Sequence, residues 1–475
     1  MSAPVIDPIH AVLDGGLRQL AALGGDCVAH ANAIGTILWS PPRVIVVGRL
    51  KAGKSTLVNA LIGAPVAETA ALEATNVVTV YQDGAPSRAE VVGLDGTRHP
   101  AHLQRATTIE LPLPTTDIAY VDRWLPSAAL RELTLIDTPG LSTLTVDNDS
   151  ATRRMTIDGF EQTRNASIDA DAAVFLFDAA PRVDEIEFLS RLPFTPLTML
   201  GVLSRADSFG EGAWGRRDPL DHATQHAHRL AGRLADVVHA VTPVSGLMAQ
   251  TSHTGMLTER HAALLARLHT IAPLDVLRIF DSDDPAAGPI TPPERAELLS
   301  LLGEYGILNG RGLAASGGAA ALNAWLAERS GIAPLRHALH ASTARYAVLH
   351  RAHRILARLD QLAFTHPARE QIRTITASLR GNPALLLVTV LEDYQRMLDT
   401  DPHAVVTEDL HTILTATSPA ERVGLDAGAP PPQVGAEAQR RLVAAQQRTL
   451  ATRSAAEDAA LVTLIRTYTA LAAGH

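Results

Sequence analysis

An apolar run, a glycine-containing octapeptide and a helical pattern follow one another without a gap near the start of this chain. Val44–Val47 is a short aliphatic run of the kind that forms a buried strand. The octapeptide Gly48–Ser55 reads Gly-Arg-Leu-Lys-Ala-Gly-Lys-Ser, and Thr56–Ile62 repeats its apolar residues at helical spacing. This order predicts a strand, a phosphate-binding loop and a helix N-terminus, and therefore an α/β fold for this part of the chain.

The octapeptide predicts a site for a nucleotide triphosphate. Its two glycines allow backbone N–H groups to turn inward around the β-phosphate. Lys54 is expected to reach the β- and γ-phosphate oxygens, and the Ser55 hydroxyl is expected to bind Mg²⁺. The residues predicted to contact the nucleotide are Gly48, Arg49, Leu50, Lys51, Ala52, Gly53, Lys54, Ser55 and Thr56.

A second loop is predicted to sense the γ-phosphate. The strand-like run Leu133–Ile136 leads into Asp137-Thr138-Pro139-Gly140. An aspartate at the end of a strand can hold Mg²⁺ through water, and the Gly140 N–H can donate to the γ-phosphate. An isolated Asp-x-Pro-Gly sequence is also a common β-turn. Its position downstream of a phosphate loop favours the functional interpretation.

Two further loops predict that the base is guanine. Ser204–Asp207 reads Ser-Arg-Ala-Asp and resembles the Asn/Thr-Lys-x-Asp motif of GTPases, although Ser204 and Arg205 depart from the usual pair. Asp207 would accept hydrogen bonds from guanine N1 and N2, and the stem of Arg205 would pack on the base. A later Thr-Pro-Val-Ser-Gly segment ends at Ser245 and Gly246, where backbone N–H groups would face guanine O6. The order of the four loops predicts GTP and GDP as ligands.

Hydrolysis also needs a threonine that binds Mg²⁺ and positions the attacking water. Thr75 precedes an apolar run and is the preferred candidate, with Thr69 as the alternative. The predicted metal ligands are therefore Ser55, Thr75 and Asp137. Leu141 occupies the place where a small signalling GTPase carries its water-orienting glutamine. Hydrolysis would then depend on another device.

Composition is typical of a soluble globular protein with two or three domains. The 475 residues are 46% hydrophobic and 19% charged, and the formal net charge is −9. This acidic balance and an aromatic content of 4% argue against a nucleic-acid partner. A single cysteine, Cys27, and the lack of a basic start followed by an apolar stretch predict a cytoplasmic protein. No apolar run reaches the roughly 18–20 residues that span a bilayer.

The pattern along the chain predicts a sheet domain inserted in an all-helical bundle. Residues 1–40 form an amphipathic helical segment, and residues 281–475 read as helical beyond a polar linker at 281–289, with a tip loop near 424–435. Residues 41–280 alternate strand and helix patterns, which predicts a mostly parallel sheet with helices on both faces. The expected strands are Val44–Val47, Val77–Tyr81, Leu133–Ile136, Ala173–Phe177, Met199–Leu203 and Ala240–Pro243.

A zinc site is a weaker candidate. His222 and His226 are four residues apart on a predicted helix, with His228 nearby, and this spacing can bind zinc. No glutamate follows as in a zinc protease, and no fourth ligand is apparent. Surface histidines are therefore the preferred interpretation.

The motifs together resemble those of bacterial dynamin-like GTPases, in particular the isoniazid-inducible dynamin-like proteins of actinobacteria. The resemblance is carried by the phosphate loop, Asp137–Leu141 and four further segments, and it spans nearly the whole chain. Those segments are Glu73–Thr75, Leu203–Asp207, Pro243–Leu247 and Glu328–Gly331.

The resemblance implies a GTPase head on a helical neck and trunk built from both chain ends. It also implies a homodimer through the heads, with switch loops ordered in trans, and GTP-driven membrane remodelling as a peripheral protein at the inner face of the plasma membrane. Many dynamins have a polar pair where this chain has Leu50 and Lys51. We hypothesise that the Lys51 ammonium replaces the monovalent cation that such a residue helps to hold; an exposed loop lysine is the alternative. The catalytic set is then Lys51, Lys54, Ser55, Thr75 and Gly140.

Two other functions stay open at this point. The protein could be a GTP-switched interaction module that acts with a paralogous partner, since no basic amphipathic helix with bulky apolar anchors is present. It could also be a ribosome- or tRNA-associated GTPase, because similar phosphate-loop motifs occur there. The acidic balance and a helical C-terminal region disfavour this second alternative.

Overall fold

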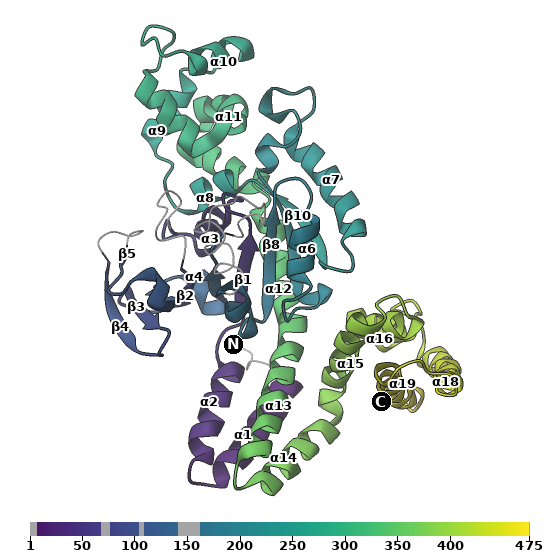
Figure 1. Cartoon of the computed structure of the whole chain (residues 1–475). Helices are drawn as coiled ribbons and strands as arrows, with labels where there is room; N and C mark the ends of the chain where they lie inside the picture. Colours follow the sequence, from purple (N-terminus) through teal and green to yellow (C-terminus); the bar gives the residue numbers. More distant parts are fainter. Residues whose placement is uncertain (1–6, 68–76, 104–108, 141–161, 475) are drawn as a thin grey trace, which may run out of the picture. The chain divides into compact units, whose positions relative to one another are not determined.

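The computed structural model describes residues 7–67, 77–103, 109–140 and 162–474 (Figure 1). The chain divides into two compact units, and each is described by itself. Residues 41–344 form one unit, here called the sheet unit. Residues 1–40 and 345–475 form the other, here called the helical unit. The two ends of the chain therefore fold together, as the sequence predicts.

A mixed sheet of ten described strands organises the sheet unit, in the order β10-β9-β8-β1-β7-β2-β6-β3-β4-β5. The run from β10 to β7 is parallel throughout, which confirms the predicted α/β class. β2 pairs antiparallel with β7 and parallel with β6, and the remaining pairs are antiparallel. The strands are β1 (Arg43–Gly48), β2 (Thr79–Asp83), β3 (Arg88–Gly93), β4 (Arg98–Leu103), β5 (Ile109–Glu110), β6 (Ile118–Leu125), β7 (Thr134–Asp137), β8 (Ala172–Phe177), β9 (Met199–Ser204) and β10 (Ala240–Val244).

All six strands expected from the sequence are present, and β3 to β6 were not predicted. The six are mostly apolar runs because their sheet is covered on both faces. β4 reads Arg-His-Pro-Ala-His-Leu and alternates between exposed and half-buried positions. Such a strand lacks the apolar run that the sequence analysis relied on, so its pairing with β3 is visible only in the structure.

Helices cover both faces of the sheet (Figure 1). Successive residues of β1 belong to two different cores: Ile45 and Val47 pack in one, and Val44 and Val46 pack in the other. The helices of this unit are α3 (Lys54–Ile62), α4 (Ala128–Glu132), α6 (Val183–Leu189), α7 (Pro219–Arg233), α8 (Gly246–His253), α9 (Glu259–Ala266), α10 (Pro273–Asp281), α11 (Pro292–Arg329) and α12 (Ile332–Ser342).

The domain boundary expected at residue 280 lies instead at Ala344. Leu298, Leu302 and Tyr305 of α11 are buried in the same apolar core as residues of the sheet. The polar segment expected to be a linker is held inside the unit by Arg295. The buried guanidinium of this arginine donates to the backbone oxygens of Ile279, Ser282, Asp284 and Ile290. The polar segment at 281–289 is therefore a connection within the sheet unit, held by Arg295, and does not mark a domain boundary.

The helical unit contains α1 and α2 from the N-terminal end, which pack with α13 and α14. A second group of helices follows, in which α19 contacts α15, α16 and α18, and α15 also contacts α16. The helices are α1 (Pro8–Ala22), α2 (Cys27–Trp39), α13 (Val348–Thr365), α14 (Arg369–Gly381), α15 (Leu386–Thr400), α16 (Val405–Thr415), α17 (Pro419–Arg422), α18 (Pro431–Arg448) and α19 (Ala455–Ala472).

The tip loop expected near 424–435 is shorter than predicted, because α18 begins at Pro431. Proline suits the first turn of a helix, where its missing N–H has no intrahelical partner and its fixed φ is already helical. The run Pro430–Pro432 therefore starts a helix instead of extending a loop.

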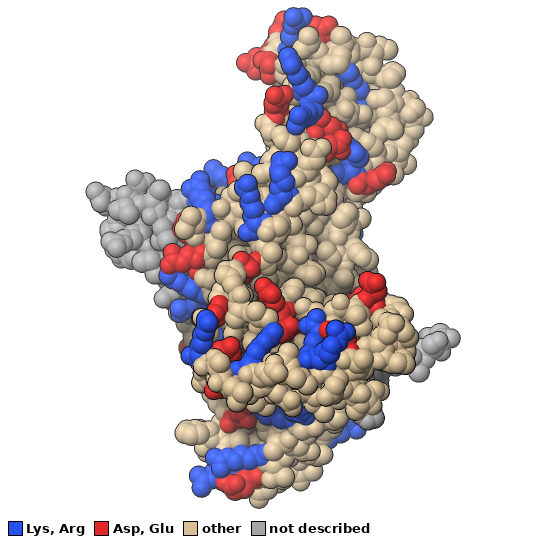
Figure 2. Space-filling model, turned by 90° about the vertical axis from the view of Figure 1, so that its right-hand side faces the viewer, with Lys and Arg blue, Asp and Glu red and all other residues tan. Residues whose placement is uncertain are grey.

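No single helix among the described residues is long and apolar enough to cross a membrane. α14 and the following segment up to Thr400 pass that test together, with a bend of 75° between them. On the face drawn in Figure 2, basic and acidic side chains are interspersed.

Candidate nucleotide-binding site

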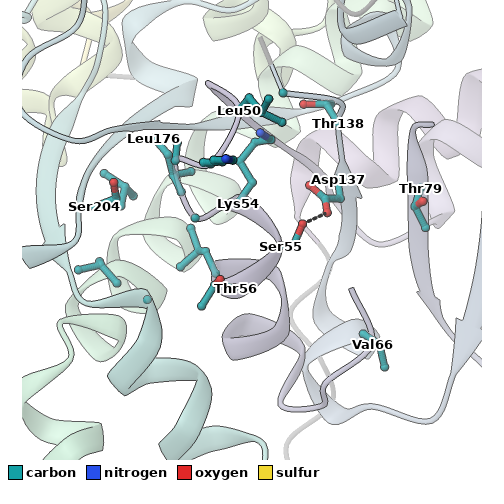
Figure 3. Close-up of a pocket in the computed structure, with 18 of the residues that line it drawn as sticks. Leu50, Lys54, Ser55, Thr56, Val66, Thr79, Asp137, Thr138, Leu176 and Ser204 are labelled. Carbon is teal, nitrogen blue, oxygen red and sulfur yellow. Dashed lines mark hydrogen bonds between the residues drawn. The ribbon is translucent and has the colours of Figure 1, made fainter. Parts of the chain in front are cut away.

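A cavity of about 650 Å³ lies at the carboxyl ends of the parallel strands and at the start of α3 (Figure 3). Ligands in open α/β sheets bind at this edge. Among the residues predicted to bind nucleotide, the cavity is lined by Leu50, Lys51, Ala52, Gly53, Lys54, Ser55, Thr56, Asp137, Gly140, Ser204, Arg205, Asp207 and Gly246. The structure thus brings together four loops that are far apart in the sequence.

Close packing and left-handed backbone shape the phosphate loop. A Cβ on Gly48 would lie 2.7 Å from the carbonyl oxygen of Leu176, so only glycine fits where β1 passes β8. Lys51 and Gly53 have positive φ angles of 62° and 95°, which turn the chain into α3. Arg49 points to α6 instead of lining the cavity. Its Nε lies 3.5 Å from Oε1 of Glu185, a residue whose pKa is raised by burial.

Lys54 is buried inside the loop. Its Nζ donates to the carbonyl oxygens of Gly48 at 3.0 Å and Arg49 at 2.9 Å. Burial lowers the pKa of Lys54, and the Asp137 carboxylate opposes this shift. The ammonium is therefore held by loop carbonyls at the centre of the site, where a phosphate would supply the opposite charge.

Ser55 and Asp137 form the part of the site that fits a cation. The Ser55 hydroxyl donates to Asp137 Oδ2 at 3.2 Å (Figure 3). The other oxygen, Oδ1, is buried and has no hydrogen-bond partner among the described residues. Burial raises the pKa of Asp137 to about 6, although Lys54 and Ser55 act to lower it. A hydroxyl beside a buried carboxylate with an unpaired oxygen fits Mg²⁺, which prefers oxygen ligands.

The loop after Asp137 lies against the phosphate loop. Thr138 Oγ1 donates to the Val46 carbonyl at 2.8 Å. A Cβ on Gly140 would lie 2.6 Å from Leu50 Cα, so the two backbones are in direct contact. The structure therefore brings Gly140 next to the phosphate loop. Thr75, Thr69 and Leu141 lie outside the described residues.

The base-recognition loop is tied to the phosphate loop by Arg205. The arginine has a positive φ of 54°, and its Nη2 donates to the Lys51 carbonyl at 2.7 Å. Ser204 Oγ donates to the Phe177 carbonyl at 3.2 Å. Asp207 lines the cavity one turn further on. Arg205 thereby joins the predicted phosphate and base ends of the site.

Ser245 is placed differently from the sequence prediction. Its N–H donates to the Ser330 carbonyl at 2.9 Å, its hydroxyl caps α8, and the residue is fully buried. Gly246 and Leu247 form the first turn of α8 and line the cavity in its place. The N–H groups of a first turn lack intrahelical acceptors, which makes them the available donors.

Several lining residues, most of them apolar, lie outside the motifs that predicted the site. Leu247 and Ser208 directly follow the predicted motifs, so a wider window would have included them. Tyr81, Val121 and Arg123 belong to β2 and β6, and β6 was not predicted. The remaining missed lining residues include Val66, Val77, Ile109, Leu111, Leu176, Val202 and Val244.

Comparisons with known proteins agree with this site. A family described as "50S ribosome-binding GTPase" matches residues 43–197, which include the phosphate loop and Asp137. The isoniazid-induced protein IniC of Mycobacterium tuberculosis is 32% identical over 449 residues, covering 89% of this chain and 87% of the relative. The isoniazid-induced protein IniA of the same organism is 35% identical over 148 residues, or 27% of this chain and 22% of the relative.

A solved structure of "an oligomerised bacterial dynamin pair" aligns with all of this chain and 76% of its own, at 14% identity and a TM-score of 0.29. The assignment follows from the sequence relatives and the site. The predicted resemblance to the isoniazid-inducible proteins is confirmed, and guanine nucleotide is the ligand class of this chain. This chain is a GTPase, and it belongs to the family of the isoniazid-induced protein IniC.

Proposed function

We propose that this protein is a dynamin-like enzyme that couples Mg²⁺-dependent GTP hydrolysis, and pairing of two sheet units across the nucleotide, to remodelling of a membrane. It would act in the cytoplasm, at the inner face of the plasma membrane. The observation that supports this most is the insertion of the sheet unit between the two parts of the helical unit. Because of that insertion, two covalent connections link the nucleotide site to the helices.

Four residues would share the work at the phosphates. Lys54 would balance charge on the β- and γ-phosphates, and Gly140 would donate to the γ-phosphate. Ser55 and Asp137 would hold Mg²⁺, with Thr75 as the expected third ligand. The ion, when bound, neutralises charge that develops on the phosphate oxygens. The buried Oδ1 of Asp137, which has no hydrogen-bond partner within the described part of the chain, supports this part of the proposal.

Lys51 would supply the positive charge that a glutamine-free site needs. Its side chain is exposed on a backbone fixed by the bond from Arg205. The sequence contains two lysines, Lys51 and Lys54. All the other side chains counted as Lys or Arg are arginines. The compact ammonium group of lysine therefore occurs only within the phosphate loop. This favours a functional role for Lys51 over the alternative that it is an ordinary exposed lysine.

The proposal is tested by steady-state GTP hydrolysis as a function of protein concentration, with and without anionic vesicles. Pairing of sheet units predicts a specific activity that rises with concentration, and membrane coupling predicts a further rise with vesicles. ATP serves as the control nucleotide and should be hydrolysed poorly. A slow rate that responds to neither variable would contradict the dynamin-like mechanism.

A GTP-switched interaction module is the second candidate. The similarity of a 148-residue segment to IniA, a second isoniazid-induced protein, favours a paralogous partner. Vesicle sedimentation separates the two candidates: the remodelling enzyme should sediment with anionic vesicles alone, whereas the module should need its partner. The ribosome-associated alternative has only the description of a family that matches residues 43–197 in its favour.

A further inference from the structure

Side chains with metal-binding donor atoms meet at one end of the helical unit. The turn between α1 and α2 and the turn between α13 and α14 lie at the same end of their bundle (Figure 1). Asp26 and Cys27 begin α2, and His30 follows one turn later. His366 ends α13 and reaches the first turn from a position 340 residues away from Asp26.

The donor atoms are close enough to share one ion. His366 Nε2 lies 3.0 Å from Asp26 Oδ1 and 3.8 Å from Cys27 Sγ. The donor atoms of Asp26, His30 and His366 all lie within 4.8 Å of one another, and Cys27 Sγ lies outside this group of three. Nitrogen, oxygen and sulfur atoms bound to one tetrahedral Zn²⁺ are separated by about 3.3–3.6 Å. His30 is exposed, so rotation of its side chain can close the remaining gap.

Burial fixes half of this cluster and leaves the other half adjustable. The His366 side chain is 8% exposed and Cys27 is 2% exposed, so packing holds both donors in place. The Asp26 side chain is 70% exposed and can move with His30 toward an ion that enters from solvent. The imidazole rings of His30 and His366 already meet edge to face, with centroids 5.7 Å apart.

We propose that Asp26, Cys27, His30 and His366 bind a Zn²⁺ ion that fastens the α1–α2 turn to the α13–α14 turn. Two imidazoles, a thiolate and a carboxylate form a donor set that suits this borderline-soft ion. Binding through Nε2 moves the ring proton of His366 to Nδ1, which now accepts from the Ala368 N–H at 3.0 Å. The Ala368 N–H lies at the start of α14 in a half-buried position and would donate to water instead. Zn²⁺ binding therefore costs one hydrogen bond within the protein.

The histidines weighed as a weaker zinc candidate from the sequence do not converge in the same way. His226 Nε2 lies 2.9 Å from the Ala179 carbonyl oxygen, and His222 packs against the Phe209 ring. Within the part of the chain that the structure describes, Asp26, His30 and His366 are the three residues whose donor atoms converge closely enough to hold an ion. An ion there would close a very long chain loop and so stabilise the helical unit, independently of GTP.

The test is a Zn²⁺ titration of the metal-free full-length chain against a chromophoric chelator, with no GTP present. We expect one equivalent of Zn²⁺ to bind and to raise the melting temperature. Asp26→Asn and His30→Gln should each weaken binding about 100-fold or more, since even partners of metal ligands cost about 10- to 100-fold. Both residues are exposed, so these variants keep the fold even if His366→Gln does not.

Two further measurements identify the ligands. The Co²⁺-loaded chain should show a thiolate-to-cobalt charge-transfer band that Cys27→Ser removes. The matched control is His228→Gln, which alters an exposed histidine on α7 and should leave Zn²⁺ affinity unchanged. Absence of stoichiometric binding at micromolar Zn²⁺ would overturn the proposal, as would equal affinity in His30→Gln and His228→Gln.

Discussion

Burial acts on two opposite charges at the phosphate site. It lowers the pKa of Lys54 and raises the pKa of Asp137 to about 6, while each group favours the charged form of the other. Bringing both out of water without further partners is costly. Nucleotide phosphates for Lys54 and a cation for Asp137 would remove that cost, which supports the proposal that these residues bind a nucleotide and a cation rather than forming a structural ion pair.

Removal of the Lys54 ammonium should abolish nucleotide binding. Lys54→Ala deletes the charge that would meet two phosphates, and hydrogen bonds to charged groups are worth about 1.5–3 kcal/mol each. We expect the affinity for a fluorescent GTP analogue to fall by at least about 100-fold. Circular dichroism should show an intact fold, because the only hydrogen bonds that Lys54→Ala removes are those from the ammonium to the Gly48 and Arg49 carbonyl oxygens. Unchanged binding would contradict the assignment of the whole site.

Asp207 should set the choice of base. Asp207→Asn replaces one acceptor by a donor, which can no longer match both guanine N1 and N2. The loss in GTP affinity should be about 1.5–3 kcal/mol, or roughly 10- to 100-fold. Competition between GTP, ITP and ATP measures this effect. The variant should bind GTP no better than ITP, and retained preference for GTP would place base recognition elsewhere.

Lys51 should make hydrolysis independent of potassium. If its ammonium takes the place of a monovalent cation, the wild-type rate will be the same in sodium and potassium buffers. Lys51→Ala should lose most of the rate without losing GTP binding, because the side chain would act on the transition state. Rates at saturating GTP in the two buffers test this. Strong potassium stimulation of the wild type would exclude the idea.

Among the elements, the junction between α11 and α12 holds the loop that is predicted to bind the base. Ser330 accepts the N–H of Ser245 at 2.9 Å. The next residue, Gly331, has a φ of 79°, and a Cβ there would lie 2.1 Å from the Pro243 carbonyl oxygen. The start of α12 is therefore in backbone contact with β10, at the strand that leads to Gly246.

Gly331→Ala should disturb this junction. The alanine would have to adopt a left-handed conformation and push β10 away, and such strain costs about 1–3 kcal/mol. We expect lower stability in urea unfolding together with weaker GTP binding. Gly232→Ala is the matched control, because a Cβ on Gly232 in α7 would meet no described atom beyond its own stretch of helix within 4 Å. That change should be neutral or stabilise the protein by up to about 1 kcal/mol.

At the scale of the whole molecule, the helical unit contains a buried histidine that makes stability depend on pH. Burial lowers the pKa of His350 on α13 to about 3, with His353 and Arg354 adding to the effect. The unfolded chain takes up a proton near pH 6.5, whereas the folded chain does not. Stability from this group is therefore complete above pH 6.5 and is lost as the pH falls toward 3.

The expected slope below pH 6.5 is at most about 1.4 kcal/mol for each pH unit. Urea unfolding followed by helical circular dichroism at pH 7.5 and 5.5 measures the difference. His350→Gln should be less stable than the wild type at pH 7.5 but should lose less stability between the two values. Equal losses in both proteins would assign the pH dependence to other groups.

Local patterns predicted the parts of the fold whose causes are local. The phosphate loop, its strand and its helix are consecutive, and the strands covered on both faces are apolar runs. β4 and β6 were missed because their residues alternate or mix polarity along partly exposed strands. The start of α18 was missed because proline is compatible with both a loop and a first helical turn.

The sequence by itself determined the α/β class, the phosphate loop and the guanine-nucleotide ligand, because each is encoded in a short segment with a fixed order. Only the tertiary structure decided that residues 281–344 pack with the sheet, that Ser330 takes the Ser245 N–H, and that Arg205 holds the Lys51 carbonyl. The contact between Asp26 and His366 was likewise decided only by the tertiary structure. Each depends on contacts between residues far apart in the chain, where only the folded packing brings the partners together.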